Sequence, residues 1–172
     1  MSDNIEIRAE EPGDRDAVRR VNEAAFDTPA EADLVDALRD SGEAAPNLCL
    51  VAVEDGTVVG HICFSRARLG EDDPEILALA PMAVDPARQN EGIGSALVHE
   101  GLLRAEETEL PLVVVLGHPD YYPRFGFDPA SAYGVDCPYP DVPPESWMAY
   151  TLPKYEPGIR GTVVYAEPFG AL

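Results

Sequence analysis

The stretch that decides the fold reads Met82-Ala83-Val84-Asp85-Pro86-Ala87-Arg88-Gln89-Asn90-Glu91-Gly92-Ile93-Gly94-Ser95. It leaves an apolar, strand-type run, turns at a proline and enters an apolar helical stretch that continues to about residue 107. The first turn of a helix offers N–H groups without intrahelical partners and a partial positive charge. Gly92 and Gly94 let the backbone approach an anion with no side chain in the way. The stretch therefore predicts a phosphate cradle at the start of a helix.

Two familiar phosphate-binding loops do not fit these residues. A P-loop requires a lysine after its second glycine, and residues 88–95 contain none. A dinucleotide-binding fingerprint requires a third glycine, where this chain has Leu97. The loop by itself leaves open a purely structural alternative, a glycine turn that only enters a helix.

The residues before this loop alternate between strand and helix patterns. Strand patterns occupy four segments, at 4–8, 48–54, 57–68 and 75–84. Helix patterns occupy two, one that begins with Asp14 as its N-cap and one over 31–39. The turns are expected at Asp55-Gly56 and at 70–74, which makes the last three strands an antiparallel meander. Pro81 cannot donate to a ladder, so we expect the third strand of the meander to bulge or splay there.

The residues after the loop begin with a fully apolar run, Leu112–Leu116. Such a run is typical of a strand that is buried on both faces. Ten of the 17 prolines lie within residues 119–168, and a last strand is expected at 162–166. We interpret this region as a proline-rich elaboration from about residue 129, within a single domain over 1–172, because its loops suit packing against a core.

Two short motifs stand on either side of the apolar run. Gln89-x-x-Gly92-x-Gly94 precedes it, and Tyr122-x-x-x-Gly126-Phe127 follows it. Together they resemble the Q/R-x-x-G-x-G/A signature and the Y-x-x-x-G-F element of the GNAT superfamily of acetyl-CoA-dependent N-acetyltransferases. The resemblance covers residues 4–128, and the tail matches only as a variable final hairpin. It implies an α/β (α+β) fold with a mixed, mostly antiparallel central sheet, splayed in the middle and flanked by helices on both faces.

The resemblance also implies which residues bind acetyl-CoA. They come from the end of the third meander strand and from the loop: Met82, Ala83, Val84, Gln89, Asn90, Glu91, Gly92, Ile93, Gly94 and Ser95. The loop would hold the pyrophosphate through backbone N–H groups, with Arg88 either adding a charged contact or forming only a surface salt bridge. The strand would offer hydrogen bonds to the pantetheine arm, and a bulge there would aim an N–H at the thioester carbonyl.

The chemistry that the family implies is direct attack of an amine on the acetyl thioester. Tyr122 stands where the family often has the general acid that protonates the leaving thiolate. Tyr121 is its nearest competitor, and an aromatic core residue is the structural alternative. The amine must also lose a proton, and the sequence leaves Glu75, His118, Asp120 and a water chain open as its acceptor.

The composition excludes several classes of protein. The 32 acidic and 12 basic residues give a net charge of -20, which repels nucleic-acid phosphates. No apolar run approaches the ~20 residues of a membrane helix, and the first residues do not form a secretory signal. We therefore expect a cytoplasmic protein that binds neither nucleic acid nor membrane. Carboxylate excess with a single lysine, Lys154, is typical of proteins from salt-loving microbes.

The thiols and imidazoles are scattered along the chain. Cys49, Cys63 and Cys137 are odd in number and form no C-x-x-C pair. We therefore expect free thiols and no bound metal.

The acceptor and the assembly state are the least determined features. We expect an unidentified small molecule or peptide with a primary amine. The tail aromatics either line an acceptor pocket or pack a flap: Tyr133, Tyr139, Trp147 and Tyr150.

A non-catalytic acyl-CoA-binding sensor or regulatory protein and a structural α/β module without a ligand remain alternatives. The family resemblance also makes a homodimer possible.

Overall fold

The computed structural model describes residues 4–70 and 74–171. The chain divides into two compact units. The first holds Met1–Ser65, Ala80–Arg104 and Glu167–Leu172, and the second holds Arg66–Leu79 and Ala105–Ala166. A single domain over 1–172 stays a prediction, and residues 71–73 of the expected turn lie outside the described residues.

The strands of the first unit follow the order β1-β2-β3-β4. They are β1 (Ile5–Ala9), β2 (Ala44–Glu54), β3 (Thr57–Leu69) and β4 (Glu75–Val84), of which the end of β3 and the start of β4 belong to the second unit. β2 is antiparallel to both β1 and β3. Asp55 and Gly56 have φ angles of 50° and 83°, as the expected type I′ turn requires. The four strand segments expected before the loop are thus confirmed.

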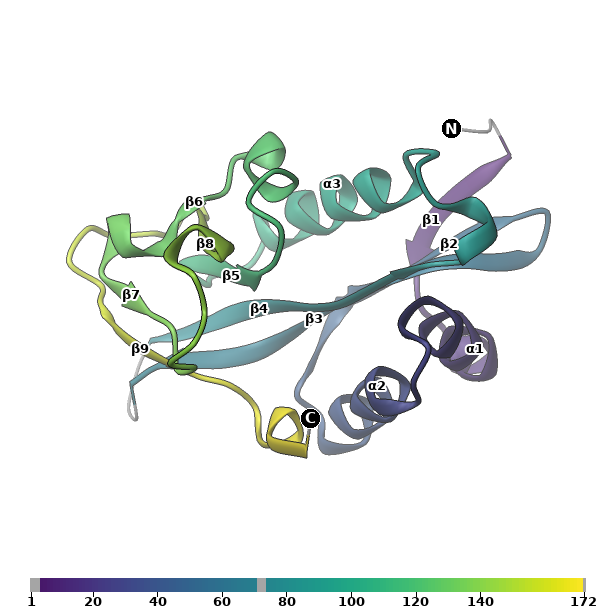
Figure 1. Cartoon of the computed structure of the whole chain (residues 1–172), viewed down its shortest axis with the longest axis horizontal. Helices are drawn as coiled ribbons and strands as arrows, with labels where there is room; N and C mark the ends of the chain where they lie inside the picture. The colour runs from purple at the N-terminus through teal and green to yellow at the C-terminus, as the bar shows by residue number, and fades with distance from the viewer. Residues whose placement is uncertain (1–3, 71–73, 172) are drawn as a thin grey trace. The chain divides into compact units, whose positions relative to one another are not determined.

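Helices cover both faces of this part of the sheet. The helices α1 (Arg15–Phe26) and α2 (Ala30–Ser41) lie on one face, and α3 (Ile93–Ala105) lies on the other (Figure 1). Val18 and Val21 of α1 are buried in one apolar cluster with Val51 of β2. On the other face, a Cβ added at Gly101 would lie 2.4 Å from Cε1 of Phe64. The glycine therefore lets α3 approach the sheet closely.

The start of α1 differs from the expectation. Asp14 precedes the helix, but its side chain makes no capping bond to it. Its Oδ2 instead accepts from the N–H of Glu11 at 2.7 Å and from Nη1 of Arg8 at 2.7 Å. Local sequence rules assign the carboxylate of Asp14 to the N-cap of α1, but in the structure it pairs with Arg8 instead.

The second unit continues the sheet with both parallel and antiparallel pairs. Its further strands are β5 (Leu112–Leu116), β6 (Asp128–Pro129), β7 (Val135–Asp136), β8 (Trp147–Thr151) and β9 (Gly161–Val164). β5 is parallel to β4 and antiparallel to β8, and β9 pairs with the end of β3. The β4–β5 register comprises the pairs Leu77–Val113 and Ala78–Val114, so it stops short of Pro81. The mixed, mostly antiparallel sheet is confirmed. A second short parallel ladder joins β7 to β9, and the β4–β5 ladder ends close to the place where we expected the sheet to open.

The proline-rich region packs against the core of this second unit. Trp147 is buried, and its Nε1 donates to the carbonyl of Val135 at 3.0 Å. Val135 and Trp147 share an apolar cluster with Leu112 and Val114 of β5, and the half-buried Tyr133 packs against that cluster. The tail is therefore held to the sheet by buried aromatic and aliphatic contacts.

Candidate active site

The loop that enters α3 is fastened to the strands of the first unit. The N–H of Asp85 donates to the carbonyl of Val59 at 2.9 Å, and Oδ1 of Asp85 accepts from the N–H of Ala87 at 2.9 Å. Nε2 of Gln89 donates to the carbonyl of Val84 at 3.2 Å. These bonds fold the chain back over the end of β4 and fix the position of the glycine segment.

The glycine segment has the backbone geometry of an anion cradle. Gly92 has a φ of 90°, a conformation that favours glycine, and its carbonyl accepts the first helical bond from the N–H of Ala96 at 3.0 Å. The N–H groups of Ile93, Gly94 and Ser95 therefore belong to the first helical turn, which has no intrahelical acceptors for them. Their partial positive charge is the feature that binds a phosphate group.

Arg88 takes part in ion pairs within the protein. Its guanidinium contacts Glu54 through both terminal nitrogens, the second at 2.8 Å, and contacts Glu91 at 3.1 Å. The hydrogen bonds that Arg88 donates to these two carboxylates raise the pKa of Arg88. Of the two roles left open by the sequence, the structure supports the salt bridge.

The end of β4 presents one edge of its backbone away from β3. β4 is the last strand in the order of the first unit, so alternate N–H and C=O groups of residues 82–84 point to its outer edge. The side chain of Ala83 is buried in the same cluster as Val18 and Val21, while Met82 and Val84 are half-buried. This edge can therefore hydrogen-bond an extended ligand without moving a side chain.

Tyr122 follows β5 in the second unit, in a short 3-10 helix, Tyr122–Phe125. Its ring meets those of Tyr121 and Phe127 edge-on, with centroids 5.0 and 5.6 Å away. Burial, with a further contribution from Tyr121, raises the pKa of Tyr122 to about 12. The phenol therefore keeps its proton at neutral pH and can act as a proton donor but not as a base.

The backbone beneath Tyr122 has no room for a side chain. A Cβ added at Gly117 would lie 2.4 Å from Cε2 and 2.9 Å from Cδ2 of the Tyr122 ring. Tyr121 differs from Tyr122, because it is half-buried and the guanidinium of Arg124 lies 4.5 Å from its ring centroid. The structure thus fixes the ring of Tyr122 and leaves Tyr121 partly accessible.

The structure separates the three side chains considered as bases. Glu75 starts β4 and pairs with Arg66 at 3.2 Å. His118 and Asp120 are exposed and follow β5. Because β4 and β5 are parallel, Glu75 lies about 16 Å along the strand direction from the end of β5. The two exposed residues therefore lie near Tyr122 in the chain and in the fold, and Glu75 lies at the other end of the ladder.

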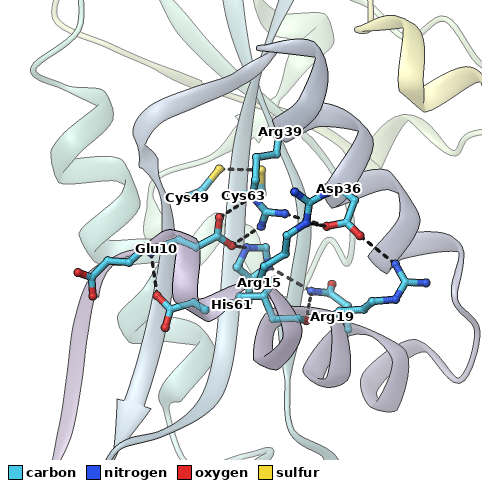
Figure 2. Close-up of polar contacts among 12 residues, drawn as sticks. Glu10, Arg15, Arg19, Asp36, Arg39, Cys49, His61 and Cys63 are labelled. Carbon is cyan, nitrogen blue, oxygen red and sulfur yellow. Dashed lines mark hydrogen bonds and ion pairs between the residues drawn. The ribbon is translucent and has the colours of Figure 1, made fainter.

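Sequence reasoning missed a buried polar cluster in the first unit. His61 is fully buried, with Nε2 3.3 Å from Oε1 of Glu10 and Nδ1 3.2 Å from Nδ2 of Asn22. Arg39 donates twice to Glu10, at 2.7 and 3.1 Å (Figure 2). Burial tends to raise the pKa of Glu10, but the bonds from His61 and Arg39 outweigh it, so that this pKa is lowered. The only sequence signal was a histidine in an apolar strand pattern.

Neither a metal cluster nor a membrane helix is found in the described part of the chain. Within residues 4–70 and 74–171, no group of three or more His, Cys, Asp or Glu side chains could hold a metal ion. No helix there is long and apolar enough to cross a membrane.

Comparisons with known proteins agree with the fold and with the family that the sequence resembles. The model of the acetyltransferase (GNAT) family matches residues 15–127. An uncharacterized N-acetyltransferase of Escherichia coli K12, YjhQ, is 40% identical over 161 residues, which cover 90% of this chain and 88% of that protein. A second, YhbS, is 34% identical over 164 residues, 95% of this chain and 97% of that protein.

Two solved structures extend the similarity. The crystal structure of YhbS from Escherichia coli in complex with CoA has a TM-score of 0.91 and 32% identity, covering 99% of this chain and 94% of that one. A GNAT family acetyltransferase from Brucella melitensis in complex with acetyl-CoA has a TM-score of 0.81 and 34% identity, covering 96% and 97%.

Proposed function

Because the chain belongs to the GNAT family of acetyltransferases, we propose that it transfers the acetyl group of acetyl-CoA directly to a primary amine of a small molecule or peptide. As a member of that family it is an N-acetyltransferase, which favours catalysis over the sensor considered from the sequence. The observation that supports the choice of acetyl donor is the loop before α3, where Gly92 turns the backbone so that a helix N-terminus is open to an anion.

Residues of the first unit would bind the donor. Residues 92–95 would hold its pyrophosphate through backbone N–H groups, and Gln89 supports them by tying the loop to Val84. Asn90 contributes through its backbone, whose φ of 66° shapes the turn. Arg88 and Glu91 pair with each other and add no net charge to the loop. Backbone dipoles thus provide the attraction in a chain whose net charge is strongly negative.

The outer edge of β4 would bind the extended arm of the donor. Residues 82–84 would hydrogen-bond the pantetheine amides in the manner of an added strand. An N–H of this edge would also stabilise negative charge on the thioester oxygen as the amine attacks. When bound, acetyl-CoA supplies an activated acyl group and a thiolate leaving group.

Tyr122 of the second unit would protonate that leaving group. A phenol with a pKa of about 12 is fully protonated at neutral pH. Its burial keeps competing water away from the proton that it donates. Tyr121 is the weaker candidate, because Arg124 already stacks on its ring.

His118, Asp120 or a water held by them would accept the proton of the incoming amine. Both side chains are exposed and directly precede the Tyr121–Tyr122 pair. An acidic protein attracts ammonium groups, so the amine arrives charged and must lose a proton before it attacks. Glu75 is a poor choice, since it is paired with Arg66 at the far end of β4.

The proposal is tested by following free thiol while a panel of amines is offered with acetyl-CoA. The panel should contain amino acids, polyamines and peptides, in buffer with and without molar potassium chloride. We expect thiol release with at least one amine. In Tyr122→Phe we expect kcat to fall about 100-fold, which is the rate enhancement that one general acid typically contributes.

Tyr121→Phe is the matched control, and its kcat should stay within about threefold of the wild type. Turnover that survives in Tyr122→Phe but is lost in Tyr121→Phe would reassign the acid. A folded protein that binds acetyl-CoA but releases no thiol with any amine would refute the proposal.

We also propose a cytoplasmic location and function at high salt, on the strength of the acidic composition. A homodimer stays a prediction.

A further inference from the structure

Two cysteines of the first unit face each other across neighbouring strands. Cys49 on β2 and Cys63 on β3 are direct partners in the antiparallel register, and their Sγ atoms lie 2.9 Å apart (Figure 2). Both are free thiols. Partners in an antiparallel pair have Cα atoms about 4.5–5.5 Å apart, within the range that a disulfide spans. The sulfurs need to approach by only about 1 Å to reach bonding distance.

A bulge in β3 creates this pairing. The register between β2 and β3 shifts between Ala52 and Val53, because β3 contains one extra residue, Val59. If β3 had no bulge, the register set by the Asp55-Gly56 turn would pair Cys49 with Ile62. Cys63 would then lie on the opposite face of the sheet from Cys49. The bulge therefore places the two thiols together, although no spacing motif links them in the sequence.

The two thiols differ in access. Cys63 is fully buried and Cys49 is only half-buried. The hydrogen bond with Cys49, burial and the carboxylate of Glu10 raise the pKa of Cys63. A solute can thus reach Cys49 first, while Cys63 is held within contact distance as a protonated partner.

We propose that Cys49 and Cys63 form an oxidation site at which a hydroperoxide produces a cross-strand disulfide. The Cys49 thiolate attacks the peroxide, the O–O bond breaks, and Cys49 becomes a sulfenic acid while hydroxide leaves. The sulfur of Cys63 then attacks the sulfur of Cys49, the S–O bond breaks, and water leaves with the proton of Cys63. In total the two thiols lose two electrons and two protons, and hydrogen peroxide becomes two waters.

This site is independent of the proposed acetyl transfer. Cys63 lies two residues from His61, on the sheet face that carries α1, whereas the glycine loop leads into α3 on the opposite face (Figure 1). Its product is a covalent bond that mass spectrometry detects without any activity assay. Failure of one proposal therefore leaves the other unaffected.

The test treats the folded full-length protein with one equivalent of hydrogen peroxide, then unfolds it and alkylates every free thiol. Untreated protein should take three alkyl groups, and oxidised protein one, on Cys137. The tryptic peptide 40–66 contains both cysteines, and it should be lighter by two hydrogens. A further cut after Glu54 should leave its two halves joined until a reductant is added.

Two variants make the result decisive. Cys137→Ser should still form the disulfide and take no alkyl group after oxidation. Cys49→Ser should keep two alkylatable thiols under the same treatment, provided that circular dichroism shows it folded. If that variant fails to fold, the Cys137→Ser result and the peptide map decide by themselves. Three alkyl groups after oxidation, a Cys49 sulfinic acid, or a disulfide to Cys137 would each overturn the proposal.

Discussion

Gly117→Ala tests the placement of Tyr122 without touching its hydroxyl. The new Cβ would lie 2.4 Å from Cε2 of the Tyr122 ring, whereas ordinary carbon contacts are about 3.5–4.0 Å. The ring must therefore shift by about 1 Å away from Gly117, which disturbs its edge-on contacts with Tyr121 and Phe127. Such overpacking costs about 1–3 kcal/mol of stability.

The same shift misplaces the phenol relative to the reacting atoms. A displacement of about 1 Å can cost on the order of 100-fold in rate, so kcat should fall by about 10- to 100-fold. The KM for acetyl-CoA should change little, because the glycine loop belongs to the other unit. Steady-state thiol release, corrected for the folded fraction, measures both constants.

A double-mutant cycle separates positioning from general damage. In a Tyr122→Phe background the acid is already absent. Adding Gly117→Ala to that variant should therefore lower kcat by a further factor of less than about three. Gly13→Ala is a neutral control, since nothing lies within 4 Å of a Cβ added there. Equal losses in both backgrounds, or full activity in Gly117→Ala, would refute the role given to Tyr122.

Three further predictions concern the rest of the molecule. Arg88→Ala should weaken acetyl-CoA binding by less than about fivefold in a calorimetric titration, because its charge is already paired; a loss above about tenfold would show that it contacts a phosphate. Glu10 has a lowered pKa, so it contributes stability that is complete above its ordinary value of 4.5 and is lost as the pH falls through the lowered folded-state value. Urea unfolding between pH 3 and 6 should therefore show a weaker pH dependence in Glu10→Gln, and an unchanged slope would exclude this role. With a net charge of -20, the thermal midpoint should rise when potassium chloride is raised to the molar range, and a midpoint insensitive to salt would contradict the halophilic interpretation.

Local sequence rules predicted the parts of the fold that local chemistry controls. Asp55-Gly56 has the positive φ angles of a hairpin turn. The apolar run Leu112–Leu116 forms a strand that pairs with β4 on one side and with β8 on the other. The glycine loop was predicted because Gly92 and Gly94 leave the backbone at the start of a helix open to an anion, and Gly92 has the φ of 90° that favours glycine. These features depend on few residues at short range, so one sequence was enough to find them.

Features that depend on tertiary register were not predictable in this way. The Cys49–Cys63 pair depends on one extra residue in β3, and no sequence pattern predicts a bulge at Val59. The environment of His61 depends on which helix covers its face of the sheet. Asp14 had the expected position for an N-cap, but the strand residue Arg8 competed for its carboxylate. In each case a partner in another strand or helix decided the outcome.

A calorimetric titration in molar potassium chloride tests the central claim most directly, that the loop before α3 binds the pyrophosphate of acetyl-CoA. Acetyl-CoA, free CoA and S-acetylpantetheine, which lacks the pyrophosphate and the nucleotide, are the three ligands. We predict micromolar binding of the first two with similar affinities, and binding of the third weaker by at least about 100-fold, since several charge-assisted bonds are lost. If the folded protein bound none of them, or bound S-acetylpantetheine as tightly as acetyl-CoA, the claim would be contradicted.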